Sequence, residues 1–108
     1  MITFSDLLAE PPLRTDTLEL DDGRECLIHE LPIGVIDHIR RISDENSGGD
    51  LKEVAWVATH ALSGKPPTSE ETEQVIKTFG SSSVMKIYFA ALKFSQLTPD
   101  AVNDKKKH

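Results

Sequence analysis

The chain has little cysteine and no long apolar run. One cysteine among 108 residues excludes an internal disulfide and is typical of a reducing compartment. No apolar stretch approaches the ~18 residues that a membrane span requires, and the N-terminal sequence MITFSDLLAEPP lacks the basic region of a secretory leader. We therefore expect a cytoplasmic protein that neither spans nor binds a membrane.

Positive charge is also scarce. Lys and Arg number 12 against 18 Asp and Glu, so the net charge is −6. An acidic chain repels phosphate backbones, and the segment SEETE places acidic residues where a DNA-reading helix would be cationic. We therefore expect no nucleic-acid partner, and a DNA-binding regulator is an alternative that the charge disfavours.

The length and composition fit one folded domain. Hydrophobic residues make up 38% of the chain and charged residues 28%, a balance typical of globular proteins. We expect a single compact domain over residues 1–98 and a flexible tail over residues 99–108. In front of Pro11 and Pro12, Thr3 or Ser5 could cap a short helical turn that carries Phe4, Leu7 and Leu8.

The pattern between about 17 and 31 predicts a β-hairpin. Asp22-Gly23 separates two short runs and is a strong hairpin signal. In the first run Leu18 and Leu20 share a face. In the second run Leu27 and Leu31 share one face, and Cys26 and Ile28 lie on the other. A two-stranded ribbon is marginal alone, so it is expected to pack on helices.

Residues from about 33 to 96 predict four short helices. The first follows Pro32 and carries an isoleucine at every third position, and the second is capped by Asp50 with Glu53 and ends at Gly64. The third opens with Thr68 and Glu71 and ends at Gly80. The last begins at Ser81–Ser83, ends at Thr98-Pro99, and is apolar on so many sides that we expect it to be central. The fold class is mostly α, with a small β content.

No cluster of residues predicts a metal site or a cofactor. His29, His38, His60 and His108 lack zinc-ligand spacing, and Cys26 points away from His29 on a strand. We interpret His38 as a solvated helix residue and His60 as a polar-face or interface residue. The loop 44–50 resembles a calcium loop, but Ala55 stands where the closing carboxylate belongs.

No local signature of nucleophilic catalysis is present either. Ser, His and Asp all occur, but none lies in a nucleophile elbow, and Cys26 lacks the positive surroundings that would activate its thiol. We therefore predict that the protein is not an enzyme and acts by binding another protein. Four aromatic residues of the second and last helices are the candidate contacts, although they could equally pack inside the domain: Trp56, Tyr88, Phe89 and Phe94.

The order of motifs over residues 17–98 resembles the small tail assembly chaperones of long-tailed bacteriophages and prophages. The shared features, in chain order, are Leu20-Asp21-Asp22-Gly23-Arg24, Glu30-Leu31-Pro32, Gly64-Lys65-Pro66, Thr68-Ser69-Glu70-Glu71, Ala90-Ala91-Leu92 and Gln96-Leu97-Thr98. The resemblance implies a non-enzymatic chaperone that binds the tape-measure protein and helps recruit tail-tube subunits around it during virion morphogenesis. Such a protein works in the cytoplasm of the bacterial host and leaves before the virion is complete.

The resemblance also implies a longer form made by ribosomal frameshifting, for which the codons of Lys105–Lys107 are the candidate slippery run. Self-association into a homo-oligomer would help a chaperone through avidity. A protein of a different class is the alternative: a small regulatory or antitoxin-like partner that masks another protein's surface.

Overall fold

The computed structural model describes residues 1–44 and 51–96. This part of the chain is mostly helical and carries one antiparallel hairpin, which confirms the predicted fold class. Several sequence predictions lie outside the described residues: the calcium-like loop, the Asp50 cap, the Thr98-Pro99 helix end, the tail over 99–108 and the lysines at 105–107.

The hairpin joins β1 (Thr15–Glu19) to β2 (Glu25–His29) in a register that pairs Thr17 with Leu27. The connection is a three-residue loop that ends at Gly23, whose φ of +87° is the left-handed conformation expected after a type I turn. The hairpin is shifted relative to the predicted range of about 17–31: β1 begins two residues earlier, at Thr15, and β2 ends two residues earlier, at His29.

One face of the hairpin packs on the helices. Ile28 is 2% exposed, and Leu18, which pairs with Cys26, packs against the core. Leu27 lies on the opposite face and is 49% exposed. Leu31 is buried, but it follows the strand, so the prediction that Leu27 and Leu31 share a strand face is wrong.

The first predicted helix is two elements. Pro32 precedes a short 3-10 turn, η1 (Ile33–Val35), and α2 (Ile36–Asp44) follows directly. Val35 and Ile39 are 2% and 1% exposed, whereas Ile33 is 77% exposed. Of the isoleucines spaced three residues apart, Ile39 is therefore buried against the body, whereas Ile33 is exposed to solvent.

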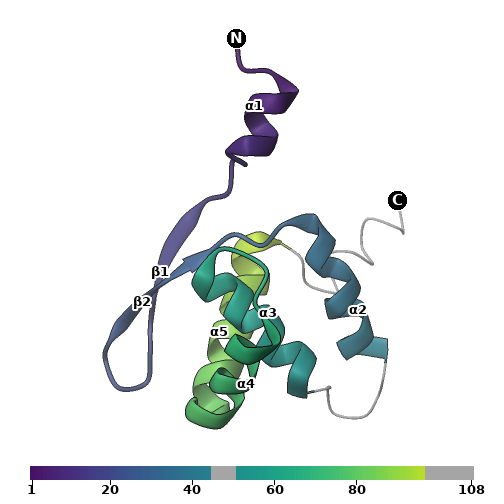
Figure 1. Cartoon of the computed structure of the whole chain (residues 1–108). Helices are drawn as coiled ribbons and strands as arrows, with labels where there is room; N and C mark the ends of the chain where they lie inside the picture. Colours follow the sequence, from purple (N-terminus) through teal and green to yellow (C-terminus); the bar gives the residue numbers. More distant parts are fainter. Residues whose placement is uncertain (45–50, 97–108) are drawn as a thin grey trace, which may run out of the picture.

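The central helix is α3 (Leu51–Ser63), which contacts α2, β2, α4 and α5. Seven of its thirteen residues are buried. The prediction that the last helix is central is wrong, since α3 lies between the other elements (Figure 1). Small side chains explain this position, because Ala55, Ala58 and Ala61, all 0–1% exposed, let neighbouring backbones approach closely.

Helices α4 (Ser69–Thr78) and α5 (Ser81–Ser95) complete the body. The predicted capping box at α4 is present: Glu71 N donates to Thr68 Oγ1 at 3.1 Å, and Thr68 N donates to Glu71 Oε1 at 2.9 Å. Gly80 has a different role from the one predicted, because it is the N-cap of α5, whereas the C-cap of α4 is Phe79.

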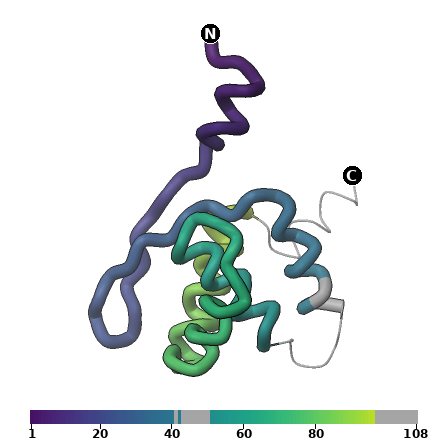
Figure 2. The backbone as a smooth tube through the Cα atoms, viewed as in Figure 1, coloured from purple at the N-terminus to yellow at the C-terminus, as the bar shows by residue number. Residues whose placement is uncertain are grey.

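The N-terminal segment stands apart from this body. Helix α1 (Phe4–Ala9) is capped by Thr3 and contains no buried residue. Figures 1 and 2 show it projecting beyond the hairpin, joined to the body by an extended stretch of chain. Within the described residues, the packed body begins at Arg14, and residues 1–13 project from it.

Candidate protein-contact surface

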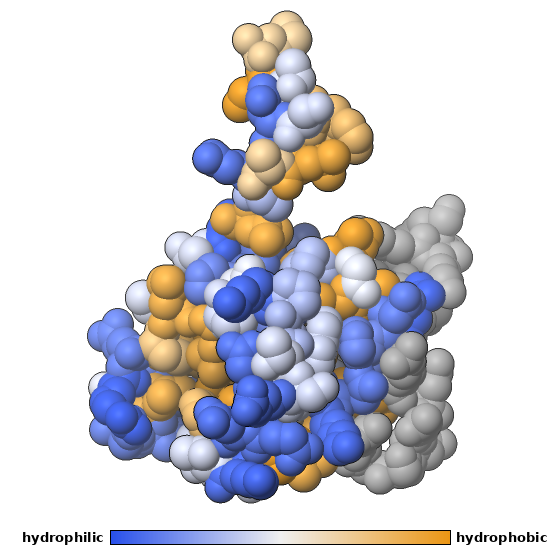
Figure 3. All heavy atoms as spheres, in the orientation of Figure 1, coloured by the Kyte–Doolittle hydropathy of each residue, from blue (hydrophilic) through white to orange (hydrophobic). Residues whose placement is uncertain are grey.

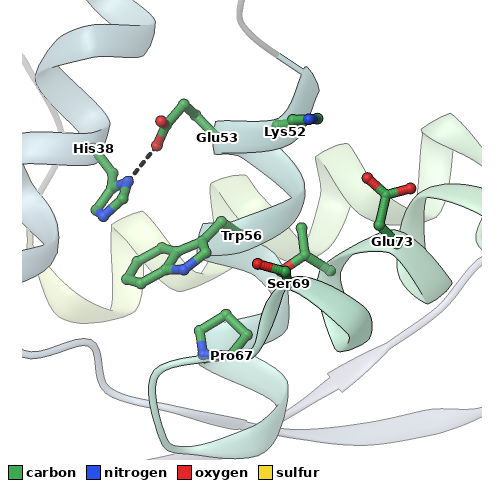
Figure 4. Close-up of a pocket in the computed structure, with 8 residues that line it drawn as sticks. His38, Lys52, Glu53, Trp56, Pro67, Ser69 and Glu73 are labelled. Atoms are coloured by element: carbon green, nitrogen blue, oxygen red, sulfur yellow. Dashed lines mark hydrogen bonds and ion pairs between the residues drawn. The ribbon is translucent and has the colours of Figure 1, made fainter.

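Trp56 lies on one face of α3 together with Glu53 and His60, which are three residues before it and four residues after it. The ring of His38, from α2, stacks on the indole with centroids 3.8 Å apart and an angle of 16° between the planes. The His60 ring meets the indole edge-on at 5.1 Å. His38 Nδ1 also shares a hydrogen bond with Glu53, as Figure 4 shows. His38 is therefore a packing residue between two helices, which corrects its interpretation as a solvated side chain.

His60 is buried in the core at 4% exposure, which corrects the prediction of a polar-face or interface residue. Its Nδ1 has no hydrogen-bond partner among the described residues. Burial of the imidazole and the proximity of His38 lower the pKa of His60 below its ordinary value of 6.5. The ring is therefore neutral at pH 7 and packs beside Trp56 as a largely apolar group.

A hollow of about 190 Å³ opens beside Trp56. Figure 4 shows the residues that surround it, which come from α2, α3, the turn after α3 and α4: His38, Lys52, Glu53, Trp56, Pro67, Ser69, Thr72 and Glu73. Its lining combines the apolar indole and proline ring with charged and polar side chains. Protein-contact sites commonly combine apolar and polar groups in this way.

The hollow contains Ser, His and Glu side chains, but they do not form a catalytic relay. Figure 4 shows Ser69 on the other side of the indole from His38, and no hydrogen bond joins these two residues. Nucleophilic catalysis requires the hydroxyl and its base within hydrogen-bond reach. Elsewhere, burial raises the pKa of the Cys26 thiol, which disfavours the reactive thiolate. Within the described residues, no three His, Cys, Asp or Glu side chains are grouped as metal ligands.

The outer face of α5 carries the second apolar surface. Phe89 is 59% exposed and Met85, one turn before it, is 38% exposed. Tyr88 belongs to the opposite, inward side: it is 4% exposed, burial raises the pKa of its hydroxyl, and its ring meets the edge of Phe89 at 5.3 Å. The prediction that Tyr88 contacts a partner is therefore corrected, because its ring is part of the core.

Phe94, near the end of α5, is covered by Arg14. The guanidinium lies 4.6 Å from the ring centroid and donates to the Phe94 carbonyl oxygen at 2.9 Å. The same guanidinium forms an ion pair with Glu30 at 3.1 Å, and these hydrogen bonds lower the pKa of the Glu30 carboxyl. Phe94 is half-buried and holds the base of the hairpin against α5, so a partner would have to displace Arg14 to reach it.

The structure thus separates the four predicted contact residues. Trp56 has its partners in α2 and α3, Phe89 faces outward from α5, and Tyr88 and Phe94 stabilise the body. Sequence reasoning missed His38 as the stacking partner of Trp56, since the two residues come from different helices. The spacing of Glu53, Trp56 and His60 on one helical face was the available signal.

The chain was compared with protein-family models, with curated proteins and with solved structures, and none of the three comparisons found a match. None of the helices in the described part of the chain is both long and apolar enough to cross a membrane.

Proposed function

We propose that this protein is a non-enzymatic phage tail assembly chaperone that binds the tape-measure protein and helps recruit tail-tube subunits. The observation that carries the proposal is the apolar outer face of α5, where Met85 and Phe89 lie one turn apart on a fully formed helix. An aromatic and a methionine side chain at this spacing suit an amphipathic partner helix, which presents its own apolar residues every three or four positions.

Two further features support binding to an aggregation-prone helical protein. The hollow beside Trp56 offers a second, separate contact, and several shallow contacts allow a chaperone to hold its client through avidity and still release it. The net charge of −6 keeps the complex soluble while the apolar surface of the client is covered.

The first test is the DNA sequence around and downstream of the gene. The proposal expects a slippery run over the codons of Lys105–Lys107, an overlapping reading frame, and a very long helical reading frame downstream. The joint absence of these features would contradict the proposal. A toxin-like reading frame beside the gene would favour the masking partner instead.

The second test is capture of the long helical protein encoded downstream. Co-expression with this chain should raise the soluble fraction of that protein, and the two should copurify. Phe89→Asp should reduce capture at least ~30-fold, as expected when an aromatic hot spot of ~2 kcal/mol is removed.

Ile33→Asp is the matched control, because Ile33 is 77% exposed on η1 and belongs to neither surface. Far-UV circular dichroism should show both variants folded. Equal loss of capture in the two variants, or no loss in either, would show that the α5 face does not bind the client.

A further inference from the structure

The N-terminal arm, residues 1–13, carries apolar side chains that the described part of the body does not cover. Ile2, Phe4 and Leu8 are 70%, 75% and 65% exposed, and Leu7 is 41% exposed. Figure 3 shows these apolar surfaces on the segment that projects from the body. Scattered exposed leucines are ordinary, but four large apolar side chains within seven residues form a patch of the kind that marks a contact.

The arm contains the helix α1, although none of the residues of this helix is buried against the body. Asp6 N donates to Thr3 Oγ1 at 3.3 Å, and Thr3 N donates to Asp6 Oδ2 at 3.1 Å. These two hydrogen bonds form a capping box at the start of α1. A helix of six residues is far below the ~12–15 residues that an isolated helix needs in water. Its apolar side must therefore be buried against another surface if the helix is to persist.

The base of the arm is held so that the arm points away from its own body. Arg14 N donates to Glu30 Oε1 at 3.2 Å, and the Arg14 guanidinium is tied to Glu30 and to the Phe94 carbonyl. Pro11 and Pro12, just before this anchor, favour extended backbone. Figures 1 and 2 accordingly show α1 well separated from α4.

The body offers a hollow of about 350 Å³ between α3 and α4. Leu62, Val75 and Phe79 supply its apolar lining, and five polar residues also border it: Thr59, Ser63, Glu71, Gln74 and Thr78. An apolar cavity of about 150 Å³ is large enough to bind benzene, the ring of a phenylalanine side chain. This hollow therefore has room for the Phe4 ring and an adjacent leucine.

We propose that two copies of this chain exchange their arms, so that Phe4 and Leu8 of each copy enter the hollow between α3 and α4 of the other. Reciprocal exchange gives a closed dimer with twofold symmetry. A phenylalanine side chain presents about 150–250 Å², so the exposed parts of Phe4 and Leu8 together present roughly 250–300 Å². Two arms and the surfaces that they cover would bury roughly 1,000–1,200 Å², the size of a weak but specific protein interface. The exchange does not rest on the proposed chaperone function.

The oligomeric state of the full chain tests the proposal. Sedimentation equilibrium should give a dimer, and Phe4→Asp with Leu8→Asp should raise its dissociation constant at least ~30-fold, as expected for loss of a hot spot. Leu27→Asp is the matched control, because Leu27 is 49% exposed on the hairpin and lies outside both surfaces. A wild-type chain that is monomeric at millimolar concentration, or an arm variant that dimerises as well as wild type, would overturn the proposal.

Disulfide trapping distinguishes exchange from the other ways of covering the arm. One chain carries Phe4→Cys and the other Phe79→Cys, both with Cys26→Ser, and the two are mixed before oxidation. Exchange predicts a disulfide between the two different chains. A disulfide only between two Phe4→Cys chains would show arm-to-arm packing instead. An internal disulfide in a chain carrying both cysteines, without covalent dimer, would show that the arm folds onto its own body. Either result would overturn the proposal.

Discussion

Replacing Gly64 with alanine should destabilise the fold through two separable effects. Gly64 ends α3 with φ of +77°, a left-handed conformation that costs a residue with a Cβ about 1–2 kcal/mol. The added Cβ would also lie 2.8 Å from Cδ2 of His29. The His29 ring cannot move away freely, because its Nδ1 donates to the Ala61 carbonyl at 2.9 Å. Overpacking of this kind costs about 1–3 kcal/mol more, so the total is about 2–5 kcal/mol.

Gly23 supplies the matched control. It has nearly the same backbone conformation, with φ of +87°, but a Cβ there would meet nothing within 4 Å. Gly23→Ala should therefore lower the free energy of unfolding by only the conformational part, about 1–2 kcal/mol. Urea unfolding followed by circular dichroism measures both variants, and the slope with urea should stay unchanged.

A double variant isolates the clash. In a His29→Ala background the ring is gone, so Gly64→Ala should lose only as much stability as Gly23→Ala does, and the coupling energy should be about 1–3 kcal/mol. Two results would contradict this reasoning. One is an equal loss of unfolding free energy in Gly64→Ala and Gly23→Ala, and the other is additive losses for Gly64→Ala and His29→Ala. Either would show that the His29 contact does not constrain this helix end.

Three other predictions concern the core and the titrating groups. Ile39→Ala should lower the free energy of unfolding by about 2–5 kcal/mol in urea titrations, since Ile39 is 1% exposed and truncation leaves a cavity. Stability should fall as the pH drops below about 6.5, because the pKa of His60 is lower in the folded protein than in the unfolded chain, which then binds more protons. His60→Phe should flatten this part of the measured pH profile. Arg14→Ala should raise the pKa of the Glu30 carboxyl toward 4.5, which an NMR titration detects, because the guanidinium hydrogen bonds that lower it are lost.

Much of the local structure is predictable from residues that are neighbours in the sequence. The turn at Asp22-Gly23, the Thr68–Glu71 capping box and the helix end at Gly64 are all present as expected. Each depends on hydrogen bonds or backbone angles within about four residues. The exception at Gly80 is instructive, because a glycine between two helices can end one or begin the next, and only the backbone conformation distinguishes these roles.

The candidate site was less predictable. Trp56 was predicted as a contact residue because aromatic side chains are common in interfaces, but its stacking partner, His38, lies 18 residues earlier in the chain on another helix. Tyr88 and Phe89 are adjacent and both aromatic, so composition cannot say which of them faces the core. The packing of α5 against α3 buries Tyr88 and leaves Phe89 in solvent.

By itself, the sequence determined the fold class, the approximate number of helices and the chemistry of the turns and caps, because these follow from local backbone preferences and from the periodicity of apolar residues. The tertiary structure alone decided which helix is central, that His60 is buried, that Leu27 faces solvent and that the N-terminal arm leaves the body. These features depend on contacts between segments far apart in the chain, and α3 is central because its small residues let neighbouring backbones approach closely.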